Sequence, residues 1–186
     1  MTLPEGFPRR TLRADRTIYR IHRADRGPWW FSTDGSGRFD PVGTGLGACY
    51  LAERPLGAWV EVFRRRMLLA EPEVRGRALF CVELGRDVKL ADLTSRRALQ
   101  FGVTASLGAD ESYAASQAFA VQAIEAGFGG VRYLVRHDPA QRLHGVALFA
   151  ASDDAAQWPQ GHDDAIPDDL SAEAVRLFGC RVLPEP

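Results

Sequence analysis

The alternation of hydrophobic and polar residues predicts a β-strand over residues 17–22, with Ile18, Arg20 and His22 on one face. An arginine that points into an apolar core would be costly. Either this face is therefore the wet wall of a cleft, or the opposite face is the core side. Four further short apolar runs also predict strands: residues 48–52, 78–84, 130–135 and 145–150.

Helical spacing of apolar residues is clearest after the second predicted strand. Pro55 suits the first turn of a helix whose apolar stripe is Leu56, Trp59, Val60, Phe63 and Met67. Three more helices are predicted over residues 95–101, 113–126 and 170–178, and a final apolar turn or strand follows them. Gly102 and Gly127 suit the ends of the first two of these. Strands mixed irregularly with few helices predict an α+β fold.

Residues 23–47 contain many glycines and polar residues and predict a long loop. Loops of this length are uncommon in compact domains unless they serve a function. The glycine run at residues 43–47 is not followed by the Gly-Lys-Ser/Thr of a Walker A loop. It also precedes a strand instead of opening a helix, so a Rossmann-type dinucleotide-binding fold is poorly supported. An earlier run in the loop, Gly35-Ser36-Gly37-Arg38-Phe39-Asp40, places Arg38 beside flexible glycines.

The length of 186 residues is that of one domain. Residues 1–16, rich in Pro, Gly and Arg, predict a flexible lead-in, and residues 17–186 a single domain. The 23 basic and 24 acidic residues nearly cancel, and no dense basic stripe with aromatics indicates direct nucleic-acid binding. Three separated cysteines without C-x-x-C spacing indicate neither a zinc site nor a disulfide framework, so no metal is expected.

No uninterrupted stretch of about 18 or more apolar residues predicts a transmembrane helix. Residues 1–16 also lack the apolar segment of a signal peptide. We therefore expect a cytoplasmic protein without a membrane partner. The basic run Arg64-Arg65-Arg66 and the acidic residues between Asp153 and Asp169 are interpreted as solvated surface.

Four residues in the first third of the chain have the chemistry of a dinucleotide site. The guanidinium forks of Arg20 and Arg38 suit the phosphate oxygens of a pyrophosphate. The ring of Tyr50 offers a stacking face for a planar heterocycle. The carboxylate of Glu61 could stabilise a cationic sugar-like transition state or hold a ribose hydroxyl. Together these groups could bind a dinucleotide and cleave its nicotinamide–ribose bond.

The order and spacing of several short motifs resemble the RES domain family, named for its Arg, Glu and Ser. The resemblance spans roughly residues 17–150, and no single motif decides it. The motifs are Tyr19-Arg20, Gly37-Arg38-Phe39-Asp40, Cys49-Tyr50-Leu51-Ala52, Ala58-Trp59-Val60-Glu61-Val62-Phe63, Leu90-Ala91-Asp92-Leu93, Phe101-Gly102-Val103-Thr104-Ala105, Tyr113 with Ser116-Gln117-Ala118-Phe119-Ala120, Gly129-Gly130-Val131-Arg132-Tyr133 and Arg136-His137-Asp138-Pro139.

The resemblance implies an ADP-ribosyltransferase-like fold with a mixed or antiparallel β core and flanking helices. It implies that NAD is the substrate, with Arg38 and Glu61 catalytic and with Arg20, Arg38 and Tyr50 binding NAD. The reactions of the family are NAD hydrolysis, NAD phosphorolysis and ADP-ribosyl transfer to a protein. Many members are bacterial toxins, so an antitoxin partner with an Xre-type helix-turn-helix is expected. The oligomeric state stays open, with a homodimer among the options.

Gln117 lies inside an otherwise small and apolar helix face. It is interpreted either as a further NAD-binding contact or as a buried amide satisfied by the backbone. The adjacent Trp29 and Trp30 could line a cleft rim or a partner interface, or anchor the long loop. With the acidic tail, the tryptophans also support the hypothesis of a structural interaction module.

One position departs from the family pattern. The family serine commonly lies in a Tyr-x-Ser-Arg-His-Asp-like run, and the corresponding residue here is Val135, whose side chain forms no hydrogen bond. A polar partner left unpaired would cost about 1–3 kcal/mol. Three serines could compensate: Ser106, Ser112 and Ser116. The departure motivates an alternative function, a catalytically weakened RES-like domain that binds a nucleotide or a partner protein without turnover.

Overall fold

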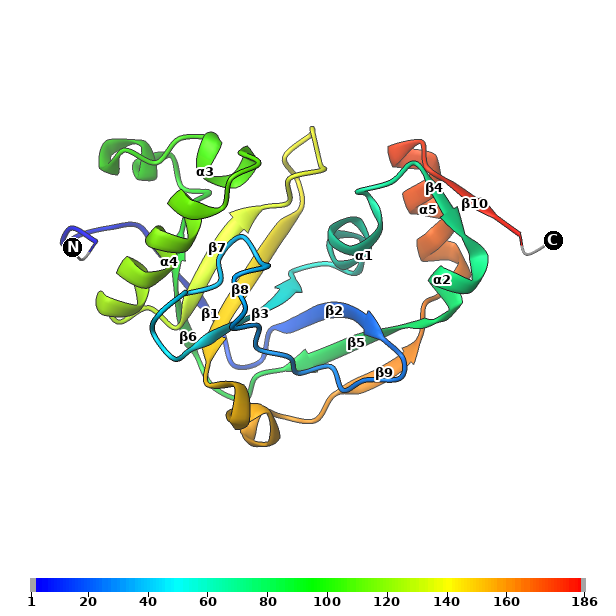
Figure 1. Cartoon of the computed structure of the whole chain (residues 1–186), viewed down its shortest axis with the longest axis horizontal. Coiled ribbons are helices and arrows are strands. Elements are labelled where there is room, and N and C mark those ends of the chain that lie inside the picture. The colour runs from blue at the N-terminus through cyan, green and yellow to red at the C-terminus, as the bar shows by residue number, and fades with distance from the viewer. Residues whose placement is uncertain (1–2, 185–186) are drawn as a thin grey trace.

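The computed structural model describes residues 3–184, which are built around an eight-stranded sheet (Figure 1). In spatial order the strands are β1 (Arg9–Leu12), β6 (Val88–Asp92), β7 (Gly130–Leu134), β8 (His144–Ala150), β3 (Gly47–Ala52), β2 (Thr17–Arg23), β5 (Arg77–Glu83) and β9 (His162–Ala165). Strands β6 and β7 pair in parallel, and the other neighbours are antiparallel. A small second sheet pairs β4 (Leu68–Ala70) with β10 (Arg181–Leu183) in parallel.

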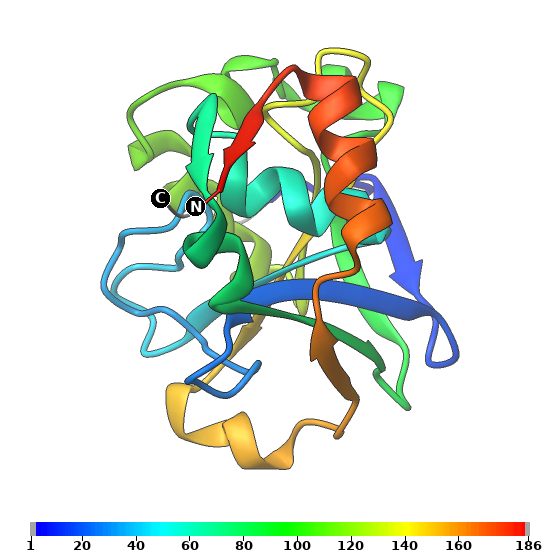
Figure 2. The same cartoon turned by 90° about the vertical axis from the view of Figure 1, so that its right-hand side faces the viewer.

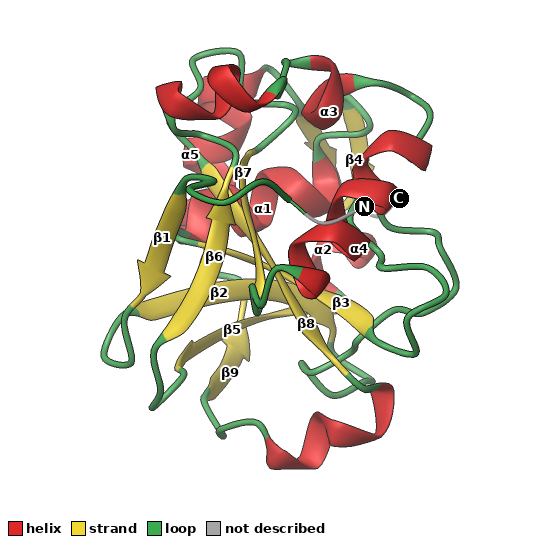
Figure 3. Cartoon of the chain, turned by 90° about the vertical axis from the view of Figure 1, so that its left-hand side faces the viewer, coloured by secondary structure: helices red, strands yellow, loops and turns green. Residues whose placement is uncertain are grey.

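The large sheet bends, so that β2, β5 and β9 run across the direction of β1, β6, β7 and β8 (Figure 3). The two halves share a buried apolar cluster, to which Ile18 and Phe80 contribute from one half and Leu90 and Leu148 from the other. Strand β5 alternates buried and partly exposed residues, whereas β3, β7 and β8 are buried on both faces and therefore carry nearly continuous apolar runs.

Helices cover the outer faces of both halves. Helix α4 (Ala114–Glu125) packs Phe119, Ala120 and Ala123 against β6, β7 and β8. Helix α1 (Pro55–Phe63) packs on β2 and β3, and α5 (Asp168–Phe178) packs on α1 (Figure 2). The connections contain α2 (Glu71–Arg75), α3 (Ser106–Ala109) and the 3-10 helices η1 (Arg96–Phe101) and η2 (Ser152–Gln157). Among residues 3–184, no helix has both the length and the apolar character that crossing a membrane requires.

This arrangement confirms the predicted α+β class and its mixed, mostly antiparallel core with flanking helices. Each of the five predicted strands is present, and none of its ends is displaced by more than one residue. The predicted helix at residues 95–101 is the 3-10 helix η1, and Gly102 ends it with a φ of 78°. The pattern does not predict β1, β4, β6 or β9. Strands β1 and β9 are mostly polar, β4 has three residues, and the apolar residues of β6 are interrupted by a lysine, so none of them forms an apolar run like that of β8.

Helix α1 begins at Pro55 as predicted and buries Trp59, Val60 and Phe63. It ends at Phe63, however, and Met67 lies outside it with 47% of its surface exposed. The chain turns after Phe63 to enter β4, whose pairing with β10 takes Met67 away from the apolar stripe.

Residues 1–16 are not a flexible lead-in, as far as the structure describes them. Residues 9–12 form β1, which pairs along its whole length with β6. Leu3, Phe7 and Leu12 are buried in the apolar clusters. The prediction rested on the Pro, Gly and Arg content, but the apolar side chains between those residues are enough to bind the segment to the sheet and to α4. Residues 1 and 2 lie outside the described part of the chain.

Candidate active site

A cavity of about 790 Å³ opens where β2 and β3 separate. The two strands pair at Tyr19 and Ala52 and then diverge. Residues 19–23 of β2 line one wall of the cavity, Tyr50 of β3 lines another, and Glu61 of α1 a third. The volume is in the range of small-molecule sites.

Arg20 bridges the gap between the diverging strands. Its Nη1 donates to the carbonyl oxygen of Tyr50 at 3.2 Å and to the Sγ of Cys49 at 2.9 Å. The side chain thereby satisfies a carbonyl that strand pairing leaves open. Its Nε is buried and has no hydrogen-bond partner among the described residues. A buried donor without a partner costs free energy, so this position favours a ligand oxygen.

The glycine-rich loop before β3 is organised by a buried carboxylate, Asp40. Its Oδ2 accepts hydrogen bonds from the Ser32 hydroxyl and the Gly37 N–H, both at 2.8 Å, and its Oδ1 accepts one from the Tyr50 hydroxyl at 2.8 Å. That hydroxyl in turn accepts from the N–H of Phe39 at 2.8 Å. Burial, and then the charge of Asp40, raises the pKa of Tyr50. Tyr50 is therefore a neutral anchor of the loop that also lines the cavity.

Close packing at Gly37 and two hydrogen bonds from Gln117 also fix the conformation of this loop. A Cβ at Gly37 would lie 2.3 Å from Asp40 Oδ1 and 2.4 Å from the Tyr50 hydroxyl, so only glycine fits there. Gln117 of α4 donates from Nε2 to the carbonyl oxygens of Gly35 at 2.8 Å and Gly37 at 3.0 Å. Both amide hydrogens are thus used. Gln117 lies outside the cavity lining, which supports the interpretation of a buried amide satisfied by the backbone, and NAD binding by it stays a prediction.

Arg38 reaches the cavity from this loop. Its Nη2 donates to the carbonyl oxygen of Asp110 at 2.7 Å and its Nη1 to that of Leu107 at 3.5 Å. Its guanidinium carbon lies 4.6 Å from the centre of the Tyr113 ring. Burial lowers the pKa of Arg38, although an arginine stays charged at neutral pH. Backbone carbonyls and a ring orient this cation without neutralising it, so its charge remains available to a ligand.

Glu61 lies two residues after the buried Trp59 on α1 and lines the cavity. Its Oε1 is buried and has no hydrogen-bond partner among the described residues. Burial raises the pKa of Glu61 to about 7, while the Tyr133 hydroxyl, Arg65 and Arg38 act against that rise. This carboxyl group is therefore available for contact with a bound molecule.

The charged groups of the cavity are very unevenly distributed. Among the described residues that line it, Glu61 is the only carboxylate, and seven are arginines: Arg20, Arg23, Arg26, Arg38, Arg65, Arg77 and Arg136. The near-zero net charge of the chain conceals this local excess. A concave site lined by one sign of charge attracts a ligand of the opposite sign. The cavity is therefore suited to an anionic ligand.

The structure brings Arg20, Arg38, Tyr50 and Glu61 together in one cavity, and their roles in binding and catalysis stay predictions. Sequence reasoning missed several lining residues: Tyr19, Arg23, Arg26, Arg65, Arg77, Tyr113, Tyr133 and Arg136. One signal was available in the sequence. Arg65, interpreted as solvated surface, follows Glu61 by four residues, the distance of one helical turn. The others depend on contacts between distant segments.

Val135 does not contribute to the cavity wall. Its side chain is 2% exposed and belongs to the apolar cluster under α1. The neighbouring residues Leu134, Arg136 and His137 line the cavity instead. Burial, and then the charge of Arg136, lowers the pKa of His137 below its usual 6.5, so its imidazole is mostly neutral at pH 7. The polar groups at this end of β7 are therefore a guanidinium and an imidazole.

The bent sheet and its arginine-lined cavity define an α+β protein with a site for an anionic ligand. A family model of the RES domain matches residues 17–169, so the chain belongs to the RES domain family. Among solved structures, the chain is similar to one from the M. tuberculosis MbcT–MbcA toxin–antitoxin complex, with 21% sequence identity and a TM-score of 0.65. That similarity covers 91% of this chain and 92% of the other. No curated protein matches the chain.

Proposed function

We propose that this chain is an NAD-consuming enzyme that cleaves the bond between nicotinamide and ribose. The observation that carries the proposal is Glu61, a partly buried carboxylate in a cavity whose other charged side chains are arginines. A pyrophosphate needs cationic donors, and a ribosyl cation needs one negative charge close by. The described lining of the cavity supplies both.

Arg20 and Arg38 are the proposed ligands of the pyrophosphate. The buried Nε of Arg20 has no partner among the described residues, and the guanidinium of Arg38 is oriented by two carbonyl oxygens and the Tyr113 ring, none of which carries a negative charge. The ring of Tyr50 is held at the cavity wall by the bond of its hydroxyl to Asp40, so it can pack against a planar ring without a loss of order.

In the proposed reaction, the electron pair of the ribose C1–nitrogen bond moves onto nicotinamide, which leaves as a neutral molecule. The remaining ribose is an oxocarbenium-like cation, and the ionised Glu61 stabilises its positive charge. An oxygen of water, of phosphate or of a protein side chain then bonds to C1 and releases its proton to solvent. Product analysis with and without phosphate distinguishes these acceptors.

Replacing Glu61 by glutamine tests the assignment. We expect Glu61→Gln to lower the rate of nicotinamide release from NAD by about 100-fold or more, because the variant keeps the shape but loses the charge that stabilises the transition state. The exposed Glu83, at the end of β5, provides a matched control, and Glu83→Gln should act like the wild type. No nicotinamide release by the wild type, or equal release by Glu61→Gln, would contradict the proposal.

A toxin role with an Xre-type antitoxin as partner is the second part of the proposal. It is supported by membership of the RES family and by the likeness to a chain of a toxin–antitoxin complex. Expression of the wild type should stop growth, Glu61→Gln should not, and co-expression of a neighbouring helix-turn-helix gene should restore growth. Growth that continues while the wild-type protein accumulates would exclude the role.

Binding without turnover is the alternative, and it rested on Val135. Because that side chain packs under α1, the departure from the family serine removes no group from the described cavity wall. Calorimetry that shows NAD binding without nicotinamide release would nevertheless favour this alternative.

A further inference from the structure

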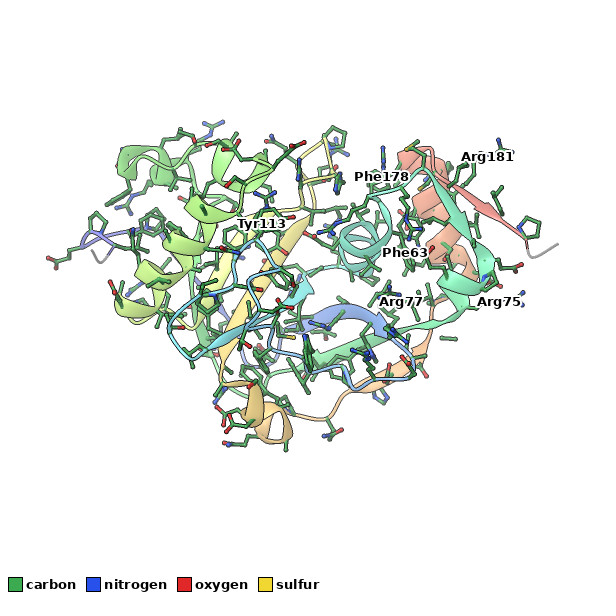
Figure 4. The ribbon with its side chains drawn as sticks, in the orientation of Figure 1. Phe63, Arg75, Arg77, Tyr113, Phe178 and Arg181 are labelled. Carbon is green, nitrogen blue, oxygen red and sulfur yellow. The ribbon has the colours of Figure 1, made fainter. Side chains whose placement is uncertain are left out.

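The cavity extends well beyond Arg20 along β2. Arg23 lies three residues further along this strand, and a strand advances about 3.3 Å per residue, so the two positions are about 10 Å apart. Arg23 pairs directly with Arg77 of β5, which also lines the cavity. In Figure 4, Arg77 lies far from Tyr113, the residue on which Arg38 packs. The arginines at residues 23, 26 and 77 therefore form an outer end of the cavity, which we call the outer arginine cluster.

This cluster has an unbalanced charge. Two cations directly opposite each other on paired strands repel, which destabilises the sheet. Asp25 binds Arg23 with both carboxylate oxygens, at 2.9 and 2.7 Å. Among residues 3–184, neither Arg26 nor Arg77 has a side-chain hydrogen bond or an ion pair, although the charge of Arg26 helps to lower the pKa of Asp25. The single carboxylate of Asp25 thus offsets only part of the charge of the three arginines, and the guanidinium groups of Arg26 and Arg77 keep donors for an anion.

Trp30, four residues after Arg26 in the chain, adds an aromatic surface to the cavity. Its neighbour Trp29 is buried, stacks on Phe31 with ring centres 6.2 Å apart, and donates from its indole to the carbonyl oxygen of Pro159 at 2.9 Å. Trp30 itself is 61% exposed and lines the cavity. The anchored backbone at Trp29 therefore holds the large, solvent-facing ring of Trp30 at the cavity wall, where the base of a nucleotide can stack.

The outer arginine cluster is separate from the reacting end. The arginines whose charges act on Glu61 are Arg65 and Arg38. If the pyrophosphate lies at Arg20 and Arg38 and the reacting ribose at Glu61, the outer end receives the adenosine. The adenosine of NAD carries no charge of its own. A phosphate on its 2′-oxygen would carry about −1.5 to −2 at neutral pH, as phosphate monoesters do.

We propose that Trp30, Arg26 and Arg77 form a subsite for 2′-phosphoadenosine, so that the enzyme uses NADP in preference to NAD. The indole stacks on the adenine, and the two guanidinium groups bind the 2′-phosphate. The placement of the adenosine rests on the proposed function of the inner site.

The first test compares kcat/KM for the two dinucleotides. The wild type should prefer NADP by about tenfold or more, the effect of a charge-assisted hydrogen bond. Arg77→Ala should lower kcat/KM for NADP about tenfold more than that for NAD, whereas Trp30→Ala should lower both equally. Arg96→Ala, which removes an exposed arginine of η1, is the matched control and should change neither. Equal use of both dinucleotides, or a preference for NAD, would overturn the proposal.

The second test needs no turnover. Calorimetry should show that the wild type binds adenosine 2′,5′-bisphosphate about tenfold or more tightly than adenosine 5′-monophosphate, and that Arg77→Ala abolishes the difference. Tight binding of the bisphosphate without cleavage of either dinucleotide would support the subsite and contradict the proposed function. Cleavage of NAD together with equal binding of the two mononucleotides would support the proposed function and contradict the subsite.

Discussion

The carboxyl group of Glu61 lies where burial opposes its ionisation and two arginines favour it. Such a residue is a cost to folding when it is charged, and sites of this kind commonly exchange stability for function. The residue next to it in the chain, Val60, is fully buried, so the helix face that forms the core also determines where Glu61 lies. Helical spacing predicted that relation, but not the surroundings of the carboxyl group.

The pKa of Glu61 predicts how stability depends on pH. Because the folded pKa of about 7 exceeds the ordinary 4.5, the folded state binds the proton more tightly, and the free energy of unfolding falls as the pH rises from about 4.5 to about 7. Glu61→Gln removes this loss. Relative to the wild type, the variant should gain on the order of 3 kcal/mol between pH 4.5 and pH 8.

Urea unfolding of both proteins at several pH values measures the effect. Glu83→Gln is the control, since Glu83 is exposed and should show no such trend. A difference between wild type and Glu61→Gln that is constant over this pH range would contradict the raised pKa.

At the scale of single elements, the glycine-rich loop shows what local patterns predict and what they omit. Its length and its glycines indicated a functional segment, and its Arg38 does line the cavity. Its conformation, however, depends on Asp40, Tyr50 and Gln117, which hold it through hydrogen bonds from three different parts of the chain. No periodicity encodes these bonds.

Removing the amide of Gln117 should loosen this loop. Gln117→Leu keeps the size of the side chain but leaves the carbonyl oxygens of Gly35 and Gly37 without their donor, which we expect to cost about 1–3 kcal/mol of stability. KM for the dinucleotide should rise more than kcat falls, because Arg38 is held by this loop. Urea unfolding and steady-state kinetics measure the two effects.

Gln122, which lies on the same helix, provides a control because Gln122→Leu leaves the loop contacts in place. A loss of kcat with an unchanged KM in Gln117→Leu would instead indicate that Gln117 acts in the chemical step.

On the scale of the whole molecule, a second group of charged side chains lies outside the cavity lining and connects the strands β6, β7 and β8. Arg132 of β7 donates from Nε to Glu53 at 2.5 Å and from Nη1 to Asp92 of β6 at 3.4 Å and to Thr94. Glu53 follows β3 and precedes α1, so this network links the sheet to the start of the helix that carries Glu61. His144 of β8 lies 3.9 Å from the same glutamate.

Breaking this network should destabilise the entire fold. Arg132→Met leaves two largely buried carboxylates without their cation and should cost about 3–5 kcal/mol. The double variant Arg132→Met/Glu53→Met should lose less than the sum of the two single variants, because it removes both partners of the closest pair.

Chemical denaturation of the single and double variants checks this expectation, with Arg96→Met as the surface control. Additive losses would mean that Arg132 and Glu53 do not stabilise each other.

The sequence by itself determined the longer strands, the helices α1 and α4, the α+β class and four of the residues that meet in the cavity. Periodic burial is a local property, and residues two to four positions apart record it directly. Short strands such as β1 have no recognisable periodicity. The apolar residues near the N-terminus become part of the core only because β6 and α4 lie beside them in the fold.

The tertiary structure alone decided where β2 and β3 separate, that Val135 packs into the core, and that seven scattered arginines line one cavity. These features arise from contacts between residues far apart in the chain. The free energies of these contacts depend on which strands are neighbours in the sheet, and no local sequence pattern predicts that order.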